Sequence, residues 1–248
     1  MPDWRVEQLR LTVFLPTDLQ RPAPSWWREI VGQEPPNQTI QQGIVIQHVG
    51  PLRGNYCQFA LEIKSGRVDW TFGPLPSSEV LTGFPSFDGL GHSLQVFREL
   101  LLPWTEQITE VRRIAFGGVL AVAVPDRIAG YRALRPLLPS LTLDVERSSD
   151  LLYQINRHAT SSAIPGLHVN RLSNWGVVLA KMQQFQIGPG GTPLVMGSNG
   201  TAFTAVRLQL DINTDADRVE PLPSGKIRPL CEELVGYGEQ IAGRGDVP

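Results

Sequence analysis

The chain has 248 residues, of which 42% are hydrophobic and 19% are charged. This composition is typical of a soluble globular protein, and the length suffices for one large domain or two small ones. The formal net charge of −2 excludes a general electrostatic attraction to nucleic acid or to an anionic membrane surface.

No targeting or membrane-spanning segment is expected. The segment Met1–Pro16 is charged and lacks the small-residue cleavage site of a signal peptide. The longest apolar run, Ile114–Val124, is about half as long as a transmembrane helix. The two cysteines, Cys57 and Cys231, are too few for a disulfide framework or a zinc site. We therefore expect a cytoplasmic protein that has no membrane contact, no metal and no other cofactor.

The first part of the chain alternates between strand and helix patterns. Val6–Leu15 has the two-residue period of a strand with one buried face, and a short helix follows that ends near Val31. Ile40–Val49 predicts another strand. Two alternating runs within Cys57–Phe72 flank the turn Ser65-Gly66 and predict a β-hairpin.

A change of composition then leads into a second series of elements. Gly73–Gly91 is rich in proline, glycine and serine and predicts a surface loop. Leu94–Ile108 carries the hydrophobic stripe of an amphipathic helix, which Pro103 should kink or divide. The nearly continuous apolar run Val111–Val124 predicts a strand buried on both faces. A helix is expected directly afterwards, over Asp126–Leu138.

The remaining expected elements are strands at Leu141–His158, Leu167–Ile187 and Ala202–Ile212, a flexible connector at Gly188–Gly200, and a final helix over Ile227–Ile241. Residues 1–109 and 110–248 thus have the same order of elements, β-α-β-β-β-α. We expect an α+β fold in which this pseudo-duplicated unit forms antiparallel sheet with helices packed on one face. Such a fold is analogous to the TATA-binding-protein (TBP-like) or helix-grip architecture, an analogy of topology that does not carry function.

Two segments carry a family resemblance. Tyr153–Trp175 (YQINRHATSSAIPGLHVNRLSNW) contains two Asn-Arg steps, and Leu208–Asn213 has the sequence LQLDIN. Together they resemble an uncharacterised bacterial protein family of about this whole length that is distributed sporadically among genomes. The family has no activity to carry over. The resemblance implies an accessory protein, for example one of antiphage defence.

The same region supplies the candidate site. If Asn156–His158 and His168–Asn170 flank one loop symmetrically, His158 lies opposite His168 and Asn156 lies opposite Asn170, all on one face. Two imidazoles beside two amides could bind a metal, an anion or a polar ligand. Zinc requires three or four protein ligands, and no carboxylate or cysteine occurs at this spacing, so a solvated polar face is favoured.

Four arginines of the second half suggest a phosphate-reading surface, namely Arg112, Arg113, Arg157 and Arg171. Ion pairs with neighbouring acidic residues explain them equally well. Asp211–Asp215 imitates the start of a calcium loop, but Ala216 and Leu222 stand where glycine and glutamate are required. No nucleophile elbow, zincin or kinase motif occurs.

Three functions remain open. The first is a non-enzymatic protein-interaction module that binds another protein or itself, as a subunit or accessory factor of a bacterial defence complex. The second is a nucleic-acid binder that uses an exposed sheet face. The third is a small-ligand or metal-dependent enzyme that uses the face carrying Asn156, His158, His168 and Asn170. The missing catalytic motifs favour the first.

Overall fold

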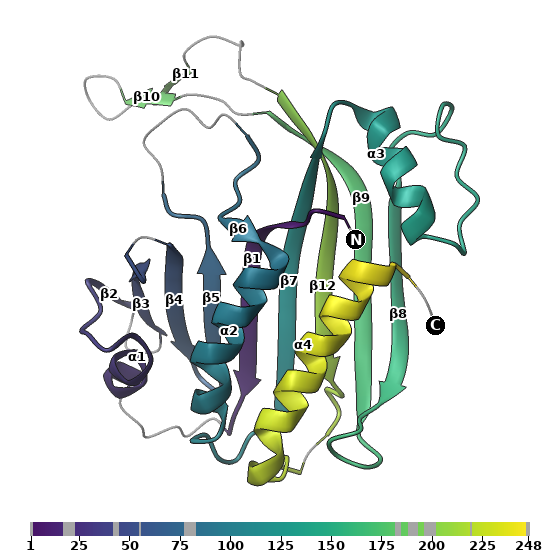
Figure 1. Cartoon of the computed structure of the whole chain (residues 1–248). Helices are drawn as coiled ribbons and strands as arrows, with labels where there is room; N and C mark the ends of the chain where they lie inside the picture. Colours follow the sequence, from purple (N-terminus) through teal and green to yellow (C-terminus); the bar gives the residue numbers. More distant parts are fainter. Residues whose placement is uncertain are drawn as a thin grey trace.

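The computed structural model describes residues 2–16, 23–41, 45–54, 56–76, 83–181, 185–187, 193–195, 202–218 and 220–246. One antiparallel sheet dominates the fold, and nine of its described strands follow one another in the order β2-β3-β4-β5-β1-β7-β12-β9-β8 (Figure 1). The strands are β1 (Arg5–Phe14), β2 (Asn37–Gln41), β3 (Val45–Leu52), β4 (Cys57–Lys64), β5 (Arg67–Gly73), β7 (Arg113–Val124), β8 (Leu152–Thr160), β9 (His168–Lys181) and β12 (Ala202–Thr214). The short strand β6 (Asp88–Gly89) pairs with β1, and β10 (Phe185–Ile187) pairs separately with β11 (Pro193–Val195).

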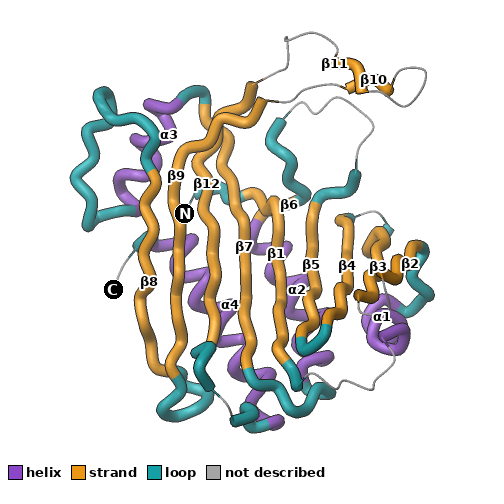
Figure 2. Tube along the Cα trace, turned by 180° about the vertical axis from the view of Figure 1, so that it is seen from behind, coloured by secondary structure: helices purple, strands orange, loops and turns teal. Residues whose placement is uncertain are grey.

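The described residues form four α-helices on one face of this sheet, α1 (Ala23–Val31), α2 (Leu90–Thr105), α3 (Arg127–Leu134) and α4 (Ile227–Arg244). Figure 2, seen from behind, shows the strands in front and the helices beyond them. α2 and α4 lie side by side over the central strands, and α3 packs on β7, β9 and β12. In the part of the chain that the structure describes, no helix covers the opposite face, which we call the open face. The expected α+β class with helices on one side is confirmed.

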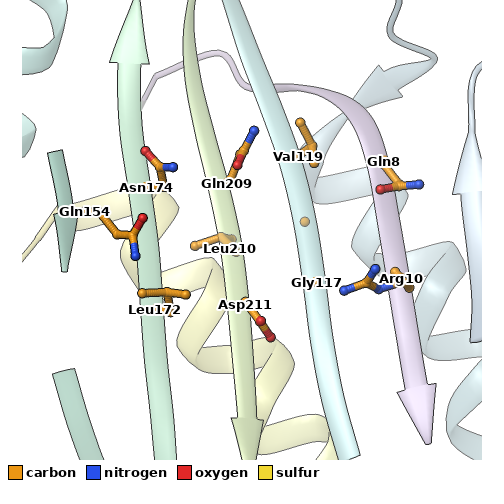
Figure 3. A pocket seen from close by; sticks show the side chains of 11 residues that line it. Gln8, Arg10, Gly117, Val119, Gln154, Leu172, Asn174, Gln209, Leu210 and Asp211 are labelled. Carbon is orange, nitrogen blue, oxygen red and sulfur yellow. The ribbon is translucent and has the colours of Figure 1, made fainter. Parts of the chain in front are cut away.

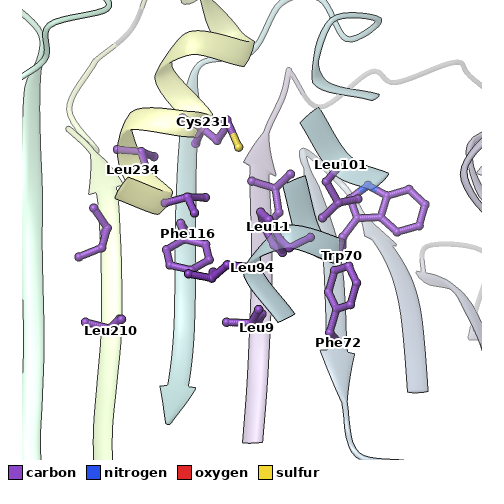
Figure 4. Close-up of a cluster of buried hydrophobic side chains, with 14 of the residues drawn as sticks. Leu9, Leu11, Trp70, Phe72, Leu94, Leu101, Phe116, Leu210, Cys231 and Leu234 are labelled. Carbon is purple, nitrogen blue, oxygen red and sulfur yellow. The ribbon is translucent and has the colours of Figure 1, made fainter. Parts of the chain in front are cut away.

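The hydrophobic core lies between the sheet and the helices. Alternate residues of each strand point toward the helix layer, such as Leu9, Leu11, Trp70, Phe72 and Phe116 (Figure 4). The aromatic rings pack on one another, for example Phe59 on Trp70 with ring centroids 5.1 Å apart. Because successive strand residues point to opposite faces, the same alternation places the polar residues on the open face.

Several expected elements are confirmed in place. The β-hairpin is β4 and β5, the apolar run is β7, and the helix after it begins at Arg127. That helix starts where expected because the Asp126 carboxylate accepts the backbone N–H of Ala129 at 2.8 Å, an N-terminal cap. The described helices include none that is long and apolar enough to span a membrane.

Other expectations are corrected. The expected strand Ile40–Val49 is two paired strands, β2 and β3, and residues 42–44 between them lie outside the described residues. The Gly73–Gly91 loop contains β6 and the start of α2, and its residues 77–82 are not described. α2 ends at Thr105, two residues after Pro103, rather than at Ile108.

The strand expected over Leu141–His158 begins only at Leu152. Its first part is a loop whose apolar residues Leu141, Leu143 and Val145 pack against the core, which imitates strand periodicity. The Asp144 carboxylate turns this loop by accepting the backbone N–H groups of residues 146 and 147. The expected strand Leu167–Ile187 contains β9 and β10, which belong to different sheets, and β11 lies within the expected connector Gly188–Gly200. Residues 182–184, 188–192 and 196–200 of these segments lie outside the described residues.

Candidate functional site

A row of polar side chains crosses the open face. Its members are Gln8, Val119, Gln209, Asn174 and Gln154, on β1, β7, β12, β9 and β8 respectively. Each lies directly opposite the next in the antiparallel register. Four of the five end in a carboxamide, and we call these four the amide row. A carboxamide both donates and accepts hydrogen bonds, so this row can bind polar groups of either kind.

The neighbouring row contains two charged groups, one at its start and one at its centre. It runs from Arg10 through Gly117, Asp211 and Leu172 to Asn156. Between the two rows lies a hollow of about 340 Å³, which we call the open-face hollow (Figure 3). A side chain at Gly117 would occupy part of this space, since its Cβ would lie 3.5 Å from the guanidinium of Arg10.

A third row is held together by asparagine side chains. Asn213 accepts hydrogen bonds from the Arg113 guanidinium at 3.0 Å and from the Asn170 amide at 3.2 Å, both at Oδ1. Its own amide donates to Asp211 at 3.0 Å. Asn156 donates to Oδ1 of Asn170 at 3.0 Å. This network connects β7, β12, β9 and β8, and it fixes the polar side chains next to the open-face hollow.

Two of the arginines on the open face are paired with carboxylates. Arg207 makes two hydrogen bonds to Glu7, at 3.1 and 3.0 Å, and Arg67 makes two to Asp69, at 2.6 and 2.9 Å. Thr12 donates a further hydrogen bond to Asp69 at 2.5 Å. Burial raises the pKa of the Glu7 carboxyl, and the nearby guanidinium only partly offsets this effect. The positive charges of Arg67 and Arg207 are therefore compensated within the protein.

The predicted register of β8 and β9 is wrong by two residues. His158 lies opposite Asn170, and His168 lies opposite Thr160 instead of His158. The reason is a closed turn over residues 161–167, in which the backbone N–H of Ser161 donates to the carbonyl of Leu167 at 2.8 Å. A shift of two residues leaves each side chain on its expected face, so the two histidines and two asparagines all lie on the open face. The two asparagines are in contact, whereas the two histidines are not paired.

Arg157 and Arg171 lie on the opposite face from the other predicted site residues. Arg157 makes two hydrogen bonds to Asp246, at 2.5 and 3.0 Å, and Tyr153 donates to the same carboxylate at 2.6 Å. Arg171 lies over the ring of Tyr237 in α4, 5.1 Å from its centroid. The predicted cationic surface that joins these arginines with Arg113 is therefore wrong, because adjacent strand residues point to opposite sides.

A second polar cluster lies at the start of α2 and is not marked by any sequence motif. His92 Nδ1 is 2.5 Å from Asp88, Tyr56 donates to the same carboxylate at 3.0 Å, and the hydroxyls of Tyr56 and Ser93 are 3.3 Å apart. Burial raises the pKa of Tyr56 to about 12. Asp88 also accepts the backbone N–H of Gly89 at 2.7 Å. These bonds attach β6 to the start of α2, and the Ser93 hydroxyl contacts Tyr56 rather than the imidazole, so the cluster does not form a nucleophile–base pair.

Within the described ranges, no group of three or more histidine, cysteine, aspartate or glutamate side chains is placed to hold a metal ion. Comparisons with protein-family models, with curated proteins and with solved structures each find no match for this chain. The amide row and Arg10 are not identified from the sequence pattern, because the rows exist only through the pairing of strands far apart in the chain. The only signal for these residues is their position at the polar points of alternating strands.

Proposed function

We propose that this chain is a non-enzymatic interaction module that binds its partner on the open face of the sheet. One observation carries the proposal: a hollowed polar surface extends across β1, β7, β12, β9 and β8 (Figure 3), and in the described structure no helix lies over it (Figure 2). The three rows contain arginine, amides and aspartate but neither lysine nor glutamate. Arginine is enriched at protein interfaces, and side-chain amides can pair with the polar groups of a partner.

The order of strands supports a duplicated unit as the origin of this face. From the central pair β1 and β7, the strands follow outward as β1-β5-β4-β3 on one side and as β7-β12-β9-β8 on the other. In each half the first strand pairs with the last, and one helix follows the first strand while another follows the last. We propose that residues 1–109 and 110–248 are two copies of one unit in a TBP-like arrangement, with β2 as an addition to the first.

Nucleic-acid binding is less favoured by the charges of the face. A phosphate backbone is bound by arginines and lysines whose charge is free. On the open face, Arg67 and Arg207 are paired with carboxylates, and Asp211 lies beside the hollow. The wider proposal of a bacterial defence complex rests on the family resemblance alone.

The test is capture of the partner at native protein levels, with variants that change only one surface. Gln154 and Gln209 are exposed on the open face, and Gln240 is exposed on α4. We expect the double variant Gln154→Glu, Gln209→Glu to lose the captured partner, whereas Gln240→Glu retains it. If the double variant retains the same partner at wild-type yield, the open face is not the interaction surface.

A further inference from the structure

We infer that the open-face hollow is an anchor for a carboxylate, which an acidic peptide segment of the partner presents to Arg10. The inference rests on the proposed function, because it names the chemistry of the partner that the open face binds. It is carried by an arginine without an acceptor, by the space beside that arginine and by the polar groups around that space.

Arg10 is the one guanidinium lining the hollow, and within the described residues no carboxylate or aromatic ring is placed against it. Its Nε is buried and has no hydrogen-bond acceptor. Arg113 and Arg171 also have a buried Nε without an acceptor, but each is engaged elsewhere. Arg113 donates to Asn213 and lies 5.0 Å from the centroid of the Phe14 ring, and Arg171 lies over an aromatic ring.

An unsatisfied buried donor is costly, and a guanidinium is best satisfied by a carboxylate that accepts two parallel hydrogen bonds. Arg67 and Arg207 have this pairing within the protein. Arg10 is therefore the position on the open face where a partner can supply the missing carboxylate.

The space beside Arg10 fits a side chain of a peptide. Gly117 lies directly opposite Arg10 on the next strand, and the Arg10 guanidinium lies over it, since a Cβ added at Gly117 would be 3.5 Å from both Nε and Nη2. The hollow of about 340 Å³ is open to solvent and extends from Arg10 toward Gln154 on β8. A peptide segment can therefore reach it from outside, with one acidic side chain at the end formed by Arg10.

The other groups of the hollow favour a peptide over a phosphate-rich ligand. Asp211 is the one carboxylate among the described residues that line it. This negative charge disfavours a ligand that carries several anionic groups more strongly than one that carries a single carboxylate. The amide row supplies hydrogen-bond donors and acceptors on the adjacent strands β12, β9 and β8 and again on β1, and a peptide backbone carries groups of both kinds.

The experiment follows the Arg10 Nε–H signal by NMR in full-length protein labelled with nitrogen-15, and the backbone N–H signals of β7 report binding in the variant that lacks Arg10. The probes are the capped tripeptide Gly-Glu-Gly, its neutral analogue Gly-Gln-Gly, and inorganic phosphate. We expect a saturable shift with the glutamate peptide and none with the glutamine peptide. Arg10→Gln should weaken binding of the glutamate peptide at least about tenfold, since a hydrogen bond to a charged group contributes about 1.5–3 kcal/mol.

Gly117→Ala is a second variant that keeps Arg10, and its Cβ makes only ordinary contacts, so the fold is expected to persist. Gly117→Ala should weaken the binding of the glutamate peptide, because the added methyl group narrows the hollow. Arg228→Gln, at an exposed residue of α4, should leave this binding unchanged. An equal response to the two peptides, no response, or a stronger response to phosphate would overturn the inference. If the peptide fails to bind but Gln154→Glu, Gln209→Glu still loses the partner, the anchor chemistry is wrong and the interaction face stands. If the peptide binds but the double variant keeps its partner, the carboxylate site stands and the proposed function fails.

Discussion

Two glycines in α4 give a direct test of how closely this helix packs on the sheet. At Gly238 an added Cβ would lie 2.6 Å from Cε1 of Phe116 and 3.4 Å from Cδ1 of Leu210. At Gly236, two residues earlier, an added Cβ would meet no atom within 4 Å. The two positions therefore share the same helix but differ in their packing.

The expected effects follow from two opposing terms. Alanine is more favourable than glycine within a helix by about 0.8–1.0 kcal/mol. At Gly238 this gain is opposed by overpacking, which costs about 1–3 kcal/mol when the neighbours cannot move. Phe116 is held because it is buried and packs edge-to-face on Phe97, with ring centroids 5.4 Å apart. We therefore expect Gly236→Ala to raise the free energy of unfolding by up to about 1 kcal/mol and Gly238→Ala to lower it by up to about 2 kcal/mol.

Urea unfolding followed by tryptophan fluorescence measures both variants against the wild type. The buried Trp104 and Trp70 report the loss of the core. The close contact between α4 and β7 is refuted if Gly238→Ala is at least as stable as the wild type and as stable as Gly236→Ala. The relative stability of the two variants is the quantity to compare, because it cancels most effects of the unfolded state.

Three further predictions concern buried ionisable groups. Burial alone would raise the pKa of the Asp246 carboxyl, but hydrogen bonds from Arg157 and a tyrosine lower it below its ordinary value. Asp246→Asn should therefore cost about 1–3 kcal/mol of unfolding free energy above about pH 4 and less in acid. An equal cost at every pH would contradict this prediction. Burial lowers the pKa of His48, which is fully buried. The unfolding free energy of the wild type should therefore fall as the pH drops below about 6.5, and His48→Phe should reduce that fall in thermal melts across this pH range. If His48→Phe has the same pH dependence of stability as the wild type, His48 is not the neutral buried group described here. Burial raises the pKa of the Cys57 and Cys231 thiols to about 12. A thiol reagent at neutral pH should therefore label these cysteines only when the protein unfolds. Rapid labelling of either cysteine in the native protein would contradict this prediction.

The strands that the sequence predicts best are those in which one face is buried and the other is polar. Cys57–Phe72 alternates on both sides of a tight turn, and this local pattern determines both the hairpin and the face that each side chain occupies. The run in β7 is apolar on both faces for a different reason: its open-face positions carry Ala115, Gly117 and Ala121, which are buried by the larger side chains of neighbouring strands.

The parts that the sequence does not predict depend on contacts between distant segments. The loop containing Leu141 and Leu143 has the alternation of a strand, because its apolar residues pack on the core without pairing to another strand. The register of β8 and β9 depends on a turn that Glu233 of α4 also holds, since its carboxylate accepts hydrogen bonds from Ser161 and Ser162. No pattern within either strand contains that information.

The candidate site follows the same division. The sequence places Asn156 and Asn170 on one polar face, which their hydrogen bond supports. It does not predict that β1 and β12 flank β7, and therefore it does not bring Arg10 and Asp211 to the two sides of Gly117. A site made from single residues of five strands becomes visible only when the order of the strands is known.

The most direct test of the open face as the interaction surface is site-specific photo-crosslinking in the native host. A photoreactive amino acid is placed at Gln8 or Gln154 on the open face and, as the control, at Gln240 on α4, all of which are exposed. We expect the same partner to be crosslinked from both open-face positions and not from Gln240. A partner crosslinked from Gln240 and from neither open-face position would contradict the account.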